Sequence, residues 1–165
     1  MLPWVQLDSA KVPGDDAELR LKQRGQEFSI MLGTNELMNS RLGHSEKALA
    51  ALALERLGDK ARPRVLIGGL GMGFTLRAAL AVAPPGARIV VSEIVPELVG
   101  WAGDHMAAVF GTCLSDPRVT VETRDVGTMI REAVSGFDAI CQRSDHISCI
   151  ERGSSVKDDD IACGT

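Results

Sequence analysis

The clearest chemical pattern in the chain is the segment VLIGGLGMGFTLR, which runs from Val65 to Arg77. It places a short apolar strand directly before a glycine-rich turn and the expected start of a helix. Gly69, Gly71 and Gly73 allow a sharp turn whose backbone N–H groups approach a ligand closely, and the N-terminus of the following helix adds positive potential. The pattern therefore predicts a nucleotide-type ligand, in preference to a turn that serves packing alone.

Two common nucleotide motifs do not fit this turn. The G-x-G-x-x-G fingerprint of nicotinamide enzymes fails, because Phe74 or Leu76 stands where the third glycine is required. No Gly-Lys-Ser or Gly-Lys-Thr follows, so the segment is not a phosphate-binding loop of the NTPase type.

Two acidic residues extend the candidate site. Glu93 closes the next apolar strand, 22 residues after Gly71, where a carboxylate accepts hydrogen bonds from both hydroxyls of a ribose. Asp125 follows a third strand and is expected beside the adenine, because ligands gather at the carboxyl ends of parallel strands. Phe74 and Trp101 are candidates for an adenine slot, although core packing is favoured for Trp101.

These residues require a parallel sheet to bring them together. Short strands, of which the first two are wholly apolar, are expected at 65–67, 89–91, 119–121 and 137–140, and helices at 45–57, 75–83, 96–110 and 126–134. Strands that are wholly apolar are typical of strands buried on both faces, and their alternation with helices predicts an α/β fold with a parallel sheet of about four strands. Residues 41–140 form this expected Rossmann-like domain.

The two ends of the chain differ from this middle region. Within residues 1–40, the turn signals at Gly25 and Gly33 separate short alternating segments and predict a small β-hairpin or three-strand unit. Residues 141–165 lose the apolar periodicity, so we expect them to be disordered. The abrupt change after Ile140 leads to the hypothesis that the gene is truncated or the reading frame shifts there.

Composition excludes several classes of protein. The 165 residues suit one main domain, and the net charge of −4, with a sequence pI near 5.4, argues against binding to nucleic acid or an anionic membrane. No apolar run reaches 18 residues, and the N-terminus has no secretory pattern, which predicts a cytoplasmic protein with unpaired thiols. The spacing of Cys141, His146, Cys149 and Cys163 matches no usual zinc pattern, so no metal is expected.

Several of these motifs resemble those of a known family. GGLGMGFTLR is similar to the GGGDGGTLRE motif of spermidine synthases, and IVVSEIVP (89–96) looks like that family's second strand with its ribose-binding acid. His44-Ser45-Glu46 resembles the Tyr-His-Glu segment that follows the family's N-terminal β domain. The resemblance covers roughly residues 28–140. It implies the class I methyltransferase fold with strand order 3-2-1-4, and S-adenosylmethionine, its decarboxylated form or methylthioadenosine as ligand.

The chain departs from the family at the residues that perform the transfer. The Asp of the glycine motif falls on Met72, and the catalytic Asp expected after the fourth strand falls on Arg143. The family uses such acids to hold and deprotonate the incoming amine. The catalytic residues therefore stay unassigned.

Three functions follow from the resemblance and these departures. The first is aminopropyl transfer from decarboxylated S-adenosylmethionine to an amine. The second is S-adenosylmethionine-dependent methyl transfer, although Ile67 stands where methyltransferases usually begin the glycine motif with an acid. The third is a truncated, non-catalytic remnant. In each case the fourth strand would form an exposed apolar edge, which predicts a homodimer or poor solubility.

Overall fold

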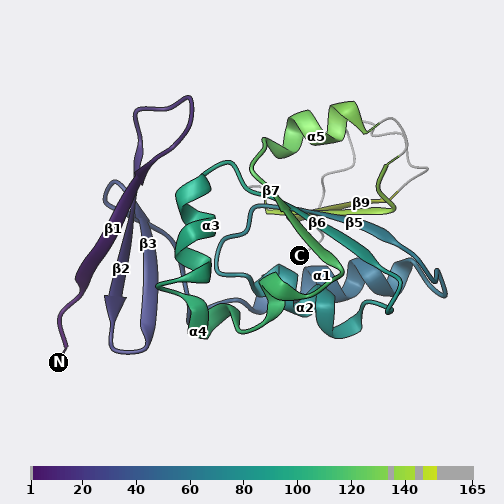
Figure 1. Ribbon diagram of the computed structural model, residues 1–165, viewed down its shortest axis with the longest axis horizontal. Helices are drawn as coiled ribbons and strands as arrows, with labels where there is room; N and C mark the ends of the chain where they lie inside the picture. Colours follow the sequence, from purple (N-terminus) through teal and green to yellow (C-terminus); the bar gives the residue numbers. More distant parts are fainter. Residues whose placement is uncertain (1, 134–135, 144–146, 152–165) are drawn as a thin grey trace, which may run out of the picture.

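The computed structural model describes residues 2–133, 136–143 and 147–151 and contains two sheets flanked by helices (Figure 1). The first sheet consists of β1 (Val5–Lys11), β2 (Glu18–Arg24), β3 (Glu27–Leu32) and β4 (Asn35–Asn39). The second sheet and its helices consist of α1 (His44–Arg56), β5 (Arg64–Gly68), α2 (Phe74–Val82), β6 (Arg88–Ser92), α3 (Pro96–Gly103), α4 (Ala107–Phe110), the 3-10 turn η1 (Cys113–Ser115), β7 (Val119–Glu122), α5 (Val126–Glu132), β8 (Ala139–Arg143) and β9 (Ile147–Glu151).

The N-terminal sheet is larger than the sequence predicts. Its four strands pair antiparallel in the order β1-β2-β3-β4, whereas the sequence pattern indicates only a hairpin or three strands. The additional strand is β1, which is mostly exposed and therefore lacks a clear alternation of apolar and polar residues. A bulge at Leu7 interrupts its pairing with β2, because Gln6 pairs with Lys22 and Asp8 with Leu21.

The central sheet confirms the predicted fold class. Strands β7, β6, β5 and β8 run parallel in that order, which is the expected 3-2-1-4 arrangement. Val65, Leu66 and Ile67 of β5 are buried, as expected for the middle strand of a sheet covered on both faces. Figure 1 shows α1 and α2 on one face of this sheet and α5 on the other, with α3 beside the N-terminal sheet.

The predicted helix over 96–110 is wrong in one respect. The chain forms two shorter helices, α3 and α4, separated by a break at Asp104, whose φ and ψ of −117° and −91° are not helical. Gly100 and Gly103 weaken helix formation before this break, since glycine in a helix costs up to about 1 kcal/mol relative to alanine. The break buries Met106 and Phe110 in the core.

The end of the central sheet also differs from the prediction. The fourth strand extends through Arg143, and Ile147–Glu151 pairs with it in antiparallel fashion as β9. The expectation that 141–165 is disordered is therefore wrong for these residues, and the remainder of that segment lies outside the described residues. The physical reason is that the edge of β8 offers unpaired backbone groups to the adjacent chain. As a result β9, and not β8, forms the edge of the sheet.

Both sheets contribute to one hydrophobic cluster. Leu21 and Ile30 of the N-terminal sheet are fully buried in the same cluster as Ile67, Leu98 and Trp101 of the α/β region. The N-terminal sheet thus packs directly against the elements that carry the candidate site.

Among the helices of the described residues, none combines the length and the apolar character that a membrane span requires.

Candidate nucleoside site

The glycine turn between β5 and α2 adopts a conformation that requires glycine. Gly69, Gly71 and Gly73 have φ angles of +90°, +52° and +70°, and no other residue type in the described part of the chain has a positive φ. A side chain strains the backbone in this left-handed region. The turn is held by the Gly69 N–H, which donates to the Ser92 carbonyl at 2.7 Å, and by the Gly73 N–H, which donates to the Leu70 carbonyl at 2.9 Å.

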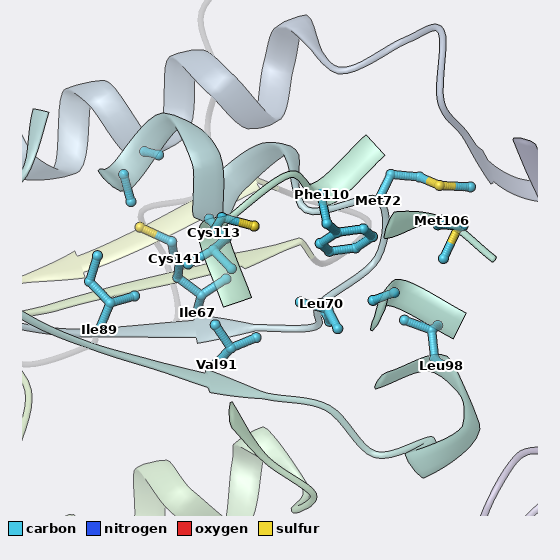
Figure 2. Close-up of a cluster of buried hydrophobic side chains, with 14 of the residues drawn as sticks. Ile67, Leu70, Met72, Ile89, Val91, Leu98, Met106, Phe110, Cys113 and Cys141 are labelled. Carbon is cyan, nitrogen blue, oxygen red and sulfur yellow. The ribbon is translucent and has the colours of Figure 1, made fainter. Parts of the chain in front are cut away.

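The turn buries its side chains and exposes its backbone. Leu70 and Met72 are 4% and 2% exposed and lie in the cluster with Met106 and Phe110 (Figure 2). Gly69 is exposed, and a Cβ placed on it would meet nothing within 4 Å. Met72, where the resemblance expects a catalytic acid, is therefore a core residue. The open space beside Gly69 lets a ligand approach the backbone.

Glu93 fastens the turn to the end of β6. Its carboxylate accepts hydrogen bonds from the backbone N–H of Leu70 at 2.9 Å and of Val95 at 3.0 Å, and the residue is 6% exposed. A carboxylate offers about four acceptor positions, so two remain after these bonds.

Asp125 has a structural role in addition to its expected place at the site. It is the N-cap of α5, and its Oδ1 accepts hydrogen bonds from the Thr128 N–H at 2.8 Å and the Thr128 hydroxyl at 2.9 Å. These hydrogen bonds, the backbone one foremost, lower the pKa of the Asp125 carboxyl. The preceding residue, Arg124, accepts a hydrogen bond on its carbonyl from the Ser92 hydroxyl at 2.5 Å. Asp125 is exposed and therefore accessible to a ligand.

Strand register brings these residues to one edge of the sheet. Gly68 of β5 pairs with Ser92 of β6, which pairs with Glu122 of β7. Gly69 and Glu93 each follow directly after this row and are therefore neighbours. The loop that carries Asp125 leaves the same edge, as the sequence pattern predicts.

Arg143 lies at the same edge on the other side of β5. Gly68 pairs with Gln142 of β8, and Arg143 follows directly. The resemblance places a catalytic acid at this position, and the chain has an arginine there. Neither position therefore carries the expected acid: methionine stands at position 72 and arginine at position 143.

Two contacts near the turn have no clear signal in the sequence. The Met38 side chain of β4 packs against Gly71, since a Cβ on that glycine would lie 3.1 Å from the Met38 sulfur. The Phe74 ring covers Gly43, and Lys47 and Arg77 place their cationic groups 5.5 and 5.0 Å from its centroid. Phe74 therefore packs against the start of α1.

Trp101 makes the third contact that the sequence does not reveal. Its indole N–H donates to the Asp8 carboxylate at 2.7 Å, and the side chain is buried, as favoured from the sequence.

The described residues contain no group of three or more His, Cys, Asp or Glu side chains that would suit a metal ion.

Comparison with known proteins gives a consistent picture. No protein-family model matches the chain. The polyamine aminopropyltransferase of Corynebacterium efficiens is 32% identical over 129 residues, which cover 76% of this chain and 24% of that protein. The chain thus spans about a quarter of the length of this curated relative.

Solved structures share the fold. A spermidine synthase in complex with the transition-state analogue AdoDATO matches with a TM-score of 0.65 and 17% identity, covering 84% of this chain and 47% of that one. The spermidine synthase of Thermotoga maritima gives 0.64 and 17%, over 83% and 47%. A probable spermidine synthase from Corynebacterium glutamicum gives 0.55 and 18%, over 84% and 50%. The chain thus spans about half the length of these proteins.

Proposed function

We propose that this chain, which is spermidine synthase-like in sequence and fold, is a transferase that binds S-adenosylmethionine or its decarboxylated form and transfers an aminopropyl group to an amine. The observation that carries this proposal is the Glu93 carboxylate, which holds the glycine turn through the Leu70 N–H, in the turn where Gly69 leaves open space for a ligand. The 32% identity to a polyamine aminopropyltransferase supports the transfer of this particular group.

In this proposal, three loops share the recognition of the donor. Glu93 binds the ribose hydroxyls, and Asp125, at the end of β7, lies beside the adenine. The backbone of Gly69, Gly71 and Gly73 allows the nucleoside to approach the N-terminus of α2, which no side chain caps among the described residues. The donor is a substrate here, and no metal is part of the proposal.

The transfer itself is a substitution at carbon. The nitrogen of the amine attacks the propyl carbon bonded to the sulfonium of the decarboxylated donor, the carbon–sulfur bond breaks, and its electron pair returns to sulfur to leave methylthioadenosine. The attacking nitrogen loses one proton to a base. Neither Met72 nor Arg143 is such a base at pH 7, so the proposal assigns residues to donor binding and leaves the base unassigned.

A second candidate function is a donor-binding unit without transfer activity. The burial of Met72, where the family has an acid, favours this candidate.

Methyl transfer is the third candidate, and it differs from aminopropyl transfer in the donor. Titration with S-adenosylmethionine and with its decarboxylated form, in parallel, separates these two reactions, because the transferase prefers the donor that it uses.

The first test is thermal unfolding of the chain with and without methylthioadenosine, which probes the nucleoside site alone. At about one hundred times its dissociation constant, the ligand is expected to stabilise the folded state by roughly 2.7 kcal/mol. An unmoved transition would contradict nucleoside binding.

The second test measures the methylthioadenosine that is released when the chain is incubated with the decarboxylated donor and a diamine. Binding of the donor without release of methylthioadenosine would favour the non-catalytic unit.

A further inference from the structure

A hydrogen bond joins the N-terminal sheet to the α/β region across 93 residues of sequence. The buried Trp101 indole of α3 donates to Oδ2 of Asp8 at 2.7 Å. This hydrogen bond is the main reason why the pKa of the Asp8 carboxyl is lowered. Without the carboxylate, the indole N–H would be a buried donor without this acceptor, which is costly.

The bulge in β1 directs Asp8 to this position. Because Leu7 is the extra residue, Asp8 pairs with Leu21 and lies two residues before the buried Ala10. Residues two apart share a face of a strand, so Asp8, which is itself exposed, lies at the rim of the face that carries the buried Ala10. From this exposed rim the Asp8 carboxylate reaches the indole N–H of Trp101.

Helix α3 in turn controls the loop that holds Glu93. It begins at Pro96, directly after Val95, whose N–H donates to the Glu93 carboxylate at 3.0 Å. The Leu98 N–H donates to the Val95 carbonyl at 3.1 Å, which ties this loop to the first turn of the helix. A rotation of α3 therefore moves one of the two N–H groups that orient Glu93.

We propose that Asp8 is a positioning residue for the nucleoside site, because its hydrogen bond to Trp101 fixes α3 and thereby the Glu93 carboxylate. This inference rests on the proposed function. Met38, on the same sheet, contacts the glycine turn at Gly71, so the N-terminal sheet supports both halves of the site. Figure 1 shows this sheet directly beside α3.

The test compares three variants by amide hydrogen exchange and by calorimetric titration with methylthioadenosine. Asp8→Leu removes the acceptor, Asp8→Asn retains an acceptor oxygen, and Asp16→Leu changes an exposed acid in the β1–β2 connection as a control. We expect Asp8→Leu to speed exchange at Val95 and Leu98 and to weaken binding about tenfold, which is the order of change that a residue acting through a packed network produces at a remote site. Asp8→Asn should restore most of the affinity, and Asp16→Leu should change neither measurement.

The exchange measurement separates this inference from the proposed function, because it needs no ligand. Unchanged exchange at Val95 in a folded Asp8→Leu would overturn the coupling even if the wild type binds methylthioadenosine. Faster exchange together with no binding by the wild type would overturn both the nucleoside site and the positioning role. If Asp8→Leu does not fold, Trp101→Phe removes the donor and keeps an aromatic ring, and it should give the same two changes.

Discussion

The Glu93 carboxylate and the Leu70 backbone N–H, 2.9 Å apart, connect the end of β6 to the glycine turn after β5. The same carboxylate accepts from Val95 at 3.0 Å, so one side chain joins the loops that follow two neighbouring strands. Because the residue is buried, both bonds form in surroundings where an unpaired N–H is expensive. Glu93 therefore shapes the site even without a ligand.

Replacing Glu93 by glutamine should reveal this structural role. Glutamine keeps one acceptor oxygen, but its amide nitrogen cannot accept the second backbone N–H. Leaving that N–H unpaired should lower the free energy of unfolding by about 1–3 kcal/mol. Urea unfolding followed by circular dichroism measures the change, and stabilisation by methylthioadenosine should also be lost.

Glu97→Gln is the matched control for this substitution. Glu97 is exposed on α3, four residues from Glu93, so its replacement should change the free energy of unfolding by no more than about 0.5 kcal/mol. Equal effects of the two substitutions would show that the hydrogen bonds of Glu93 contribute nothing to the turn.

Met72→Asp should not restore a catalytic acid. At 2% exposure, the new carboxylate would lie in the cluster with Met106 and Phe110, where a charged group without a partner costs several kcal/mol. We expect a large loss of stability and no gain in methylthioadenosine release. Met72→Leu keeps the apolar volume and should cost less than about 1.5 kcal/mol. A stable and more active Met72→Asp would contradict the core position of this residue.

Much of the α/β region follows from local sequence patterns. The run at Val65–Ile67 predicts a strand buried on both faces because every residue in it is apolar, and the structure has β5 there. The places of Gly69 and Glu93 also follow, because consecutive parallel strands end at the same edge of the sheet. Short-range periodicity is sufficient for these predictions.

The contacts between distant segments do not follow from such patterns. Nothing near Met72 in the sequence indicates that its side chain turns inward, since this depends on the positive φ angles of the flanking glycines. The bond between Asp8 and Trp101 depends on how one sheet docks on a helix of the other unit. The strand β9 depends on the open edge of β8, which composition alone does not reveal.

Gly73→Ala should destabilise the fold for two independent reasons. The φ of +70° is left-handed, which costs an L-residue about 1–2 kcal/mol. A Cβ there would also lie 2.6 Å from the Phe110 ring, and displacing this buried ring should cost about 1–3 kcal/mol more. Chemical unfolding measures the total loss of stability.

Gly100→Ala is the matched control for Gly73→Ala. Gly100 lies within α3, and a Cβ on it would meet nothing within 4 Å. Alanine should therefore stabilise the helix by about 0.5–1 kcal/mol. If the two substitutions changed stability in the same direction, the conformational requirement at Gly73 would be refuted.

The stability of the chain should depend on pH through Asp116. Its carboxylate accepts three hydrogen bonds from Arg118, which lower its pKa to about 2 from a usual value of 3.8. Arg118 also donates to the Ala83 carbonyl at 2.8 Å, so the pair ties the loop before β7 to the end of α2. A pKa that is lower in the folded state stabilises the fold above pH 3.8, and this contribution is lost as the pH falls towards 2.

The difference in Tm between the wild type and Asp116→Asn should therefore be constant from pH 7 to 5 and shrink between pH 4 and 2. A difference that persists at pH 2 would show that the charge of Asp116 is not what stabilises this connection.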